Sequence, residues 1–255
     1  MSAVLKVQDL SFNYPRGPLI FSKVGFELQA GCVLSILGAN GTGKSTLLNC
    51  IAGMLRQNTG TIHLEDRNVA GMSLRDIATH IGYVPQIHNP TYAYTVREFV
   101  VMGRTPYLRA FASPRKADYE IAEQAIARMN ITHLLDKAYT EISGGERQLA
   151  TIAQAIAQQP KILMLDEPTA HLDYGNQMRT MRLIRSLAEE GYSIIFTTHI
   201  PDHPLFLGGD VAVFNKKTIT VGNATDILTS AALSELYDIS VKTTEVNGRR
   251  ICYAE

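Results

Sequence analysis

The chain has 255 residues, and its 24 basic side chains balance its 24 acidic ones. A chain of this length can bury a full hydrophobic core, and its balanced charge argues against nucleic acid or an anionic membrane surface as a partner. No apolar run approaches the roughly 18 residues that a membrane-spanning helix needs, and the N-terminus lacks a signal-peptide block, so we expect a cytoplasmic protein.

The N-terminal part of the chain has the patterns of strands and turns. Residues 4–8, 22–28 and 61–64 are predicted strands of an antiparallel β layer. The apolar run at residues 33–37 predicts a buried strand, and residues 46–53 predict a short helix that Gly53 ends. The segment between this strand and this helix is rich in glycine.

That segment, residues 38–45, reads GANGTGKS and fits the pattern of a phosphate-binding loop. Its glycines allow backbone N–H groups to face phosphate oxygens, and the helix dipole places positive charge beneath them. Lys44 is expected to neutralise the β- and γ-phosphates, and Ser45 to ligate Mg²⁺. An ordinary glycine-rich turn is the alternative, and a chance match has odds on the order of one in a hundred. The predicted nucleotide-binding residues of this segment are Gly38, Asn40, Gly41, Thr42, Gly43, Lys44, Ser45 and Thr46.

Strand and helix patterns alternate over the rest of the chain, except in its middle. Further core strands are predicted at residues 81–84, 162–166, 193–198 and 211–214, which favours an α/β fold with a mostly parallel sheet. A capping box of Thr95 and Glu98 opens a helix, and apolar spacing predicts another from Asp118 to Asn130. We therefore predict a helical subdomain at residues 88–158, inserted into an α/β core formed by residues 1–87 and 159–255.

Two acidic residues follow the buried strand that begins at Ile162. Asp166 ends that strand at its carboxyl end, where open α/β sheets bind ligands, so it can hold Mg²⁺ opposite Ser45. Glu167 is adjacent and can orient or deprotonate an attacking water. The alternative is that both acids cap a turn before Pro168, and the phosphate loop upstream argues against it.

The segment Ser143-Gly144-Gly145-Glu146 has two interpretations. Ser-x-x-Glu is a capping box, and the apolar spacing after it predicts a helix that ends before Pro160. A cap does not require two consecutive glycines, whereas glycines at a helix N-terminus leave N–H groups open to an anion. Because one triphosphate does not need this second phosphate site, we infer that two copies of the chain hold nucleotide between them.

In this order and spacing, the motifs resemble those of the nucleotide-binding subunit of an ABC transporter over essentially the whole chain. The resemblance implies a P-loop NTPase core, with ATP and Mg²⁺ as its ligands. It implies that Gln86 reaches Mg²⁺ and the attacking water, and that His199 contacts the γ-phosphate. It also implies that Tyr14, with Phe12 as the weaker alternative, stacks on adenine.

The same resemblance implies contacts with a second copy of the chain. The signature segment, residues 143–146, would bind the ATP held by the other copy: Ser143, Gly144, Gly145 and Glu146. Asp173 would lie in a loop that contacts the opposite subunit. A homodimer is therefore expected, with Glu167, His199 and Gln86 as its catalytic residues.

Residues 94–107 narrow the resemblance to ATPase subunits of importers for iron chelates, haem, vitamin B12 and oxyanions such as molybdate. This implies two membrane permease subunits, an indirect periplasmic or surface solute-binding partner, and a position at the cytoplasmic face of the membrane. The alternative is a soluble ABC-type ATPase of DNA repair or translation. The spacing of the motifs leaves no room for a long coiled coil, and only one cassette is present.

Some residues depart from the family pattern. Ile142 replaces a leucine, and His171 occupies a position that is commonly serine. Pro201 and Pro204 crowd a region that is helical in the family, so we predict no regular helix there. His203 is therefore expected at the surface rather than as a metal ligand paired with His199. The remaining histidines receive no predicted role, and the three cysteines are predicted to be small buried hydrophobes rather than a disulfide framework.

Overall fold

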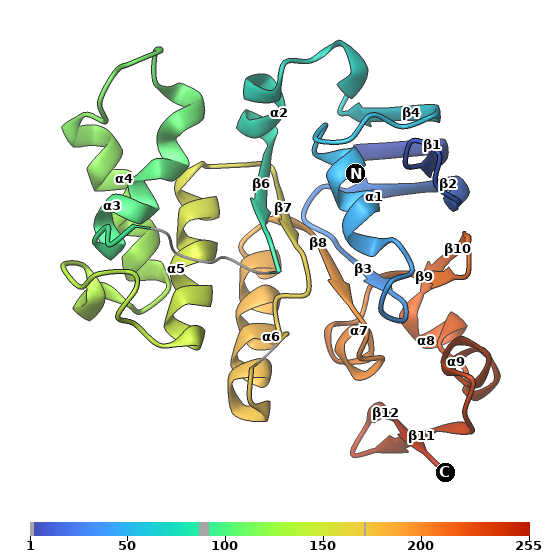
Figure 1. Cartoon of the computed structure of the whole chain (residues 1–255). Helices are drawn as coiled ribbons and strands as arrows, with labels where there is room; N and C mark the ends of the chain where they lie inside the picture. Colours follow the sequence, from blue (N-terminus) through green and yellow to red (C-terminus); the bar gives the residue numbers. More distant parts are fainter. Residues whose placement is uncertain (1–2, 87–91, 171) are drawn as a thin grey trace.

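The computed structural model describes residues 3–86, 92–170 and 172–255. An antiparallel sheet has strand order β2-β1-β4-β5 and lies beside a six-stranded sheet of order β10-β9-β3-β8-β7-β6 (Figure 1). The antiparallel sheet contains β1 (Ala3–Asn13), β2 (Leu19–Gln29), β4 (Thr59–Leu64) and β5 (Arg67–Asn68). The larger sheet contains β3 (Val33–Leu37), β6 (Ile81–Val84), β7 (Ile162–Leu165), β8 (Ser193–Thr198), β9 (Asp210–Asn215) and β10 (Thr218–Asn223). All neighbours in the larger sheet are parallel except β9 and β10, which confirms the predicted α/β fold with its antiparallel layer.

Helices cover both faces of the larger sheet. The α-helices are α1 (Lys44–Ile51), α2 (Leu74–His80), α3 (Val96–Val101), α4 (Lys116–Arg128), α5 (Gly144–Ala157), α6 (Tyr174–Glu189), α7 (Asp202–Leu207), α8 (Ala224–Ile227) and α9 (Ser230–Tyr237). Short 3₁₀ helices are η1 (Val69–Gly71), η2 (Met102–Tyr107) and η3 (Thr132–Leu134). A hairpin of β11 (Val241–Val246) and β12 (Arg249–Ala254) follows α9.

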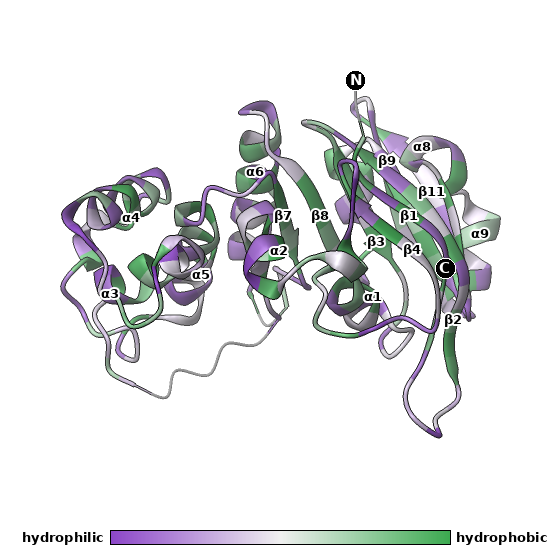
Figure 2. Cartoon of the chain, turned by 90° about the horizontal axis from the view of Figure 1, so that it is seen from above, coloured by the Kyte–Doolittle hydropathy of each residue, from purple (hydrophilic) through white to green (hydrophobic). Residues whose placement is uncertain are grey.

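Alternate residues of the central strands face two different cores, because successive side chains of a strand point to opposite faces. Met164 on β7 and Ile195 on β8 pack with α1 and the antiparallel sheet. Leu163 and Phe196 pack on the other face with α3 to α6. Viewed from above, the strands therefore run as a hydrophobic layer between helices (Figure 2).

Helices α3, α4 and α5 pack against one another at one side of the sheet (Figure 1). The capping boxes of Thr95 with Glu98 and of Ser143 with Glu146 form as predicted and fix the starts of α3 and α5. No strand occurs between residues 92 and 158, where the structure is described throughout. The subdomain bounds of 88–158 stay a proposal, since these helices share a core with β6, β7 and β8.

Helix α7 contradicts the prediction that Pro201 and Pro204 exclude a regular helix. Pro201 is the N-cap residue of α7, and Pro204 lies in its first turn. The N–H groups at the start of a helix have no intrahelical acceptor, so both prolines are tolerated there. Within the described residues, no helix is long and apolar enough to span a membrane.

Candidate functional site

The loop of residues 38–43 joins β3 to α1 at the carboxyl end of the larger sheet. Gly41 and Gly43 have φ angles of 78° and 106°, in the left-handed region that favours glycine. A Cβ atom at position 43 would lie 2.5 Å from Cγ2 of Ile20, whereas no atom of the described residues beyond its chain neighbours lies within 4 Å of one at position 41. Position 43 therefore needs glycine for its space as well as its conformation, and position 41 needs it for conformation.

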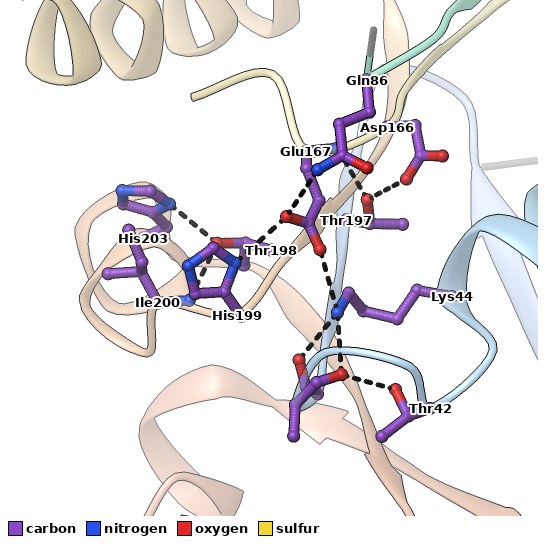
Figure 3. A network of polar contacts seen from close by, with 12 residues as sticks. Thr42, Lys44, Gln86, Asp166, Glu167, Thr197, Thr198, His199, Ile200 and His203 are labelled. Atoms are coloured by element: carbon purple, nitrogen blue, oxygen red, sulfur yellow. Dashed lines mark hydrogen bonds and ion pairs between the residues drawn. The ribbon is translucent and has the colours of Figure 1, made fainter. Parts of the chain in front are cut away.

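Lys44 folds back over this loop and is only 4% exposed. Its Nζ donates to the carbonyl oxygens of Gly38 at 2.8 Å and Ala39 at 3.0 Å. The same Nζ forms an ion pair with Oε1 of Glu167 at 3.0 Å (Figure 3). The ammonium group is thus directed toward the glycine loop and the carboxyl end of β7 at once.

Glu167 is the centre of the polar network in Figure 3. Its Oε2 accepts from Nε2 of Gln86 at 3.4 Å and lies 3.1 Å from Nδ1 of His199. Its φ angle of 45° is unusual for a residue that precedes proline. The structure therefore brings Glu167, His199 and Gln86 together with Lys44, and strained backbone of this kind is found preferentially at functional sites.

Two residues that the sequence analysis missed hold the acidic pair in place. The hydroxyl of Thr197 donates to Oδ1 of Asp166 at 2.6 Å and accepts from the N–H of Glu167 at 2.8 Å. The phenol of Tyr83 donates to Oδ2 of Asp166 at 3.3 Å. Burial, with a smaller effect of Asp166, raises the pKa of Tyr83, so the phenol stays a neutral donor. A threonine near the end of an apolar strand was the available signal for Thr197.

The phosphate loop, Tyr14, Gln86 and Glu167 line a pocket of about 470 Å³. Tyr14 is 43% exposed, and its hydroxyl lies 3.3 Å from that of Thr46. Phe12 is 4% exposed and packs edge-on against Tyr14, with ring centroids 4.9 Å apart. Tyr14 is therefore the aromatic residue at this pocket, and Phe12 belongs to the core.

The oxygens of Ser45, Asp166 and Gln86 are the hard ligands that Mg²⁺ prefers, and one or two carboxylates suffice when phosphates supply other ligands. The described residues contain no cluster of three or more His, Cys, Asp or Glu residues that could hold a metal ion without such phosphate ligands.

His203 is buried, which contradicts the prediction that it lies at the surface. It is 4% exposed, and its Nδ1 forms a hydrogen bond with the hydroxyl of Thr198 at 2.9 Å. Burial lowers the pKa of His203 to about 4. The cause is the first turn of α7, which directs the imidazole back toward the end of β8 (Figure 3). The imidazole therefore stays neutral at physiological pH and supports the strand end beside His199.

The signature segment lies at a separate place on the chain. The hydroxyl of Ser143 accepts from the N–H of Glu146 at 3.3 Å, and Oε2 of Glu146 accepts from the N–H of Ser143 at 2.8 Å. These bonds lower the pKa of Glu146. Among the described residues beyond its chain neighbours and its own helix backbone, no heavy atom lies within 4 Å of a Cβ built on Gly144, and the nearest to one on Gly145 is at 3.7 Å.

A pocket of about 290 Å³ separates the signature segment from the start of α6. Asp173 is the N-cap of α6, where its Oδ1 accepts from the N–H of Asn176 at 2.9 Å. This hydrogen bond lowers the pKa of Asp173. His171 lies outside the described residues. The signature residues do not line the pocket of the phosphate loop, so within one chain the two phosphate motifs are apart.

A pocket of about 600 Å³ lies at the opposite, amino end of the parallel strands. The residues that line it include two ion pairs, Arg128 with Glu190 and Lys161 with Glu65. It contains none of the motif residues, and open α/β sheets bind their ligands at the carboxyl ends of strands. The candidate site is therefore the smaller pocket at the phosphate loop.

Comparison with known proteins agrees with this geometry. Residues 21–170 match the ABC transporter family. The chain is 37% identical over 240 residues to the molybdate import ATP-binding protein MolC of Haemophilus influenzae, covering 94% of this chain and 90% of that protein. It is 32% identical over 231 residues to the hemin import ATP-binding protein HmuV of Rhodococcus jostii, covering 90% of this chain and 78% of that protein.

A solved structure of a metal-chelate type ABC transporter in an inward-facing conformation has a TM-score of 0.87 and 34% identity, covering 99% of this chain and 96% of that chain. The chain therefore belongs to the ABC transporter family, as an ATP-binding protein of that family.

Proposed function

We propose that this chain is the ATP-hydrolysing subunit of an ABC importer. The observation that carries the proposal is the convergence on Glu167 of Lys44, His199 and Gln86, at a pocket that the phosphate loop lines. The import names of its relatives support the direction of transport. Membership of the family alone would also fit a soluble ATPase, which is the second candidate.

The pocket fits ATP with Mg²⁺. The left-handed φ angles of Gly41 and Gly43 allow the loop's backbone N–H groups to turn toward phosphate oxygens, and the exposed ring of Tyr14 offers a stacking surface for adenine. Ser45, Asp166 and Gln86 would hold Mg²⁺, which supplies charge compensation for the phosphates. To reach the β- and γ-phosphates, the ammonium of Lys44 exchanges its contact with Glu167 for contacts with phosphate oxygens.

That exchange releases Glu167 for catalysis. Its carboxylate then accepts a proton from a water whose oxygen attacks the γ-phosphorus, while the bond to the β–γ bridging oxygen breaks. His199 already lies within hydrogen-bond distance of Glu167, so it can contact the γ-phosphate and help to hold the water. The products are ADP and inorganic phosphate.

The signature segment would complete the site from a second copy of the chain. Ser143, Gly144 and Gly145 expose N–H and hydroxyl groups at the start of α5, Glu146 closes their capping box, and the helix dipole favours an anion there. With the γ-phosphate shared between two copies, ATP stabilises the closed dimer, and its cleavage removes the shared charge. Asp173 would contact the opposite copy beside this site.

Two permease subunits are the proposed membrane partners, with a periplasmic or surface solute-binding protein acting through them. The helical region of residues 88–158, joined to the core through Gln86, would pass the closing motion to them from the cytoplasmic face. The relatives suggest a metal chelate, haem or an oxyanion such as molybdate as the solute, and the resemblance of residues 94–107 adds cobalamin.

Substitution of the central carboxylate tests the hydrolysis step. Glu167→Gln should keep ATP binding and form a stable dimer with ATP but not with ADP, as measured by light scattering after gel filtration. Hydrolysis should fall by about 10²- to 10⁴-fold. Glu120→Gln changes a charge on the surface of α4 and is the matched control. Hydrolysis by Glu167→Gln at the wild-type rate would remove Glu167 from the mechanism.

A tagged pull-down from detergent-solubilised native membranes tests the transporter assignment. We expect a polytopic membrane protein to co-purify at a one-to-one ratio, and a solute-binding protein encoded beside it can then be screened for its ligand. Recovery of the chain alone, or with ribosomes or DNA, would favour the soluble ATPase instead.

A further inference from the structure

The C-terminal module, which we define as residues 224–255, packs against β9 and β3 of the larger sheet. It contains α8, α9 and the β11–β12 hairpin (Figure 1). Leu228, Leu233 and Val241 of this module form a third core with Val211 on β9 and Leu37 on β3. Leu37 directly precedes the phosphate loop, so the module is anchored beside the candidate site.

This module also bonds to the backbone that carries His199. The phenol of Tyr237, at the end of α9, donates to the carbonyl oxygen of His199 at 2.8 Å. The N–H of Cys252, on β12, donates to Oδ1 of Asp202 at 3.0 Å. Burial raises the pKa of Tyr237, which keeps its phenol a neutral donor. The segment from His199 to Asp202 is thus held at both of its ends.

The carbonyl of His199 needs such a partner because it lies just past the sheet. Strand β8 ends at Thr198, whose own carbonyl still accepts from the N–H of Gly38 at 3.2 Å. The side chain of His199 is 40% exposed, so the surrounding residues do not enclose it, although it forms a hydrogen bond with Glu167. The direction of its imidazole therefore depends on how its backbone is held.

We propose that Tyr237 is a positioning residue for ATP hydrolysis, which fixes the backbone of His199 and so directs its imidazole toward Glu167 and the γ-phosphate. The inference rests on the proposed function of His199. A misplacement of about 1 Å can cost a reaction on the order of 10²-fold. Because β8 and Thr198 still constrain this segment, loss of the hydrogen bond from Tyr237 should lower kcat by only about tenfold.

The variant Tyr237→Phe removes the hydroxyl and keeps the ring. In the full chain, kcat for ATP should fall about tenfold, while KM and the Kd for ADP stay within about twofold of wild type. The matched control is Tyr107→Phe, because the phenol of Tyr107 also donates to a backbone carbonyl, that of Gln158 at 2.9 Å, in the helical region. This control should keep the wild-type kcat.

A double-mutant cycle with His199→Ala separates positioning from a general loss of structure. If Tyr237 acts through His199, Tyr237→Phe lowers kcat in the wild-type background and has no further effect in the His199→Ala background. Suppose His199→Ala is impaired, and Tyr237→Phe lowers kcat equally in both backgrounds or in neither. Either result overturns the inference about Tyr237 but leaves the proposed role of His199 intact. Wild-type hydrolysis by His199→Ala overturns the proposed role of His199, and with it the basis of the inference.

Discussion

The phosphate loop and the signature segment are both glycine-containing turns before a helix, yet their surroundings differ. Helix α1 begins after Gly43 with no side-chain cap, and the buried Lys44 lies at its first position. Helix α5 begins after Ser143 with a closed capping box and two glycines free of close neighbours. The first region pairs its charges inside the chain, whereas the second leaves its donors facing outward.

This difference shows how one chain supplies two unlike halves of a proposed composite site. Lys44 and Glu167 need each other because both are largely removed from water, with exposed fractions of 4% and 10%. Ser143 needs only Glu146, three residues away, and the cap is stable without distant partners. Loss of Lys44 should therefore affect folding and nucleotide binding together, whereas substitutions in the second region should leave nucleotide binding by one chain unchanged and affect events between copies.

The largest effect is expected from Lys44→Ala. This variant should lose nucleotide affinity, and its free energy of unfolding should fall by about 3 kcal/mol, because the carboxylate of Glu167 is left without its cation. Isothermal titration with ADP and urea denaturation measure the two quantities. The double variant Lys44→Ala/Glu167→Gln should regain stability without regaining affinity. Equal stability of the single and double variants would contradict the internal pairing.

The contrast between these regions also shows which features can be predicted from the sequence. The phosphate loop, the capping boxes at Thr95 and Ser143 and the buried strands were predictable because each depends on residues close together in the chain. The direct ion pair of Glu167 with Lys44 was not, since the motifs place both residues at one phosphate site but do not state that they contact each other.

The errors have a related cause. Helix α7 was missed because proline was weighed as a helix breaker without regard to its position in the first turn. The wrong prediction that His203 lies at the surface followed from that error. Thr197, Tyr83 and Tyr237 were missed because each acts through a contact with a residue far away in the sequence. The proposed roles of Tyr14, Asp166 and Asp173 stay predictions.

The second effect concerns pH and His203, which lies outside both regions and hydrogen-bonds to Thr198 beside His199. Burial lowers the pKa of His203 from 6.5 to about 4, so the folded chain keeps the imidazole neutral while the unfolded chain protonates it. Stability from this residue is present above pH 6.5 and is lost as pH falls toward 4, by about 3 kcal/mol in total.

Urea denaturation at several pH values measures this loss, and His203→Asn is the comparison, because its amide can keep a hydrogen bond to Thr198. The wild type should lose more stability than the variant between pH 6.5 and 4. Parallel curves would show that His203 titrates as it does in water.

A smaller effect is expected from Ser143→Ala in the signature segment. Loss of the cap should lower the free energy of unfolding by about 1 kcal/mol, because the N–H of Glu146 loses its acceptor. The affinity for ADP, measured on the dilute chain, should not change. ATP hydrolysis should fall because the hydroxyl proposed to contact the other copy's ATP is gone. A weaker affinity for ADP would show that the two regions are coupled within one chain.

The smallest effect on folding is expected from Gly144→Ala. In the described part of the chain, no heavy atom beyond the helix's own backbone and the chain neighbours lies within 4 Å of the added methyl group. Alanine also loses less conformational entropy than glycine in a helix, so stability should be kept or rise by less than about 1 kcal/mol. ADP affinity should also be kept. ATP hydrolysis and ATP-dependent dimer formation should nevertheless fall, because the methyl group would stand between the exposed N–H groups and a phosphate from the second copy. A variant with full hydrolysis and normal dimers would place that phosphate elsewhere, and the outward-facing glycines would then serve only the turn.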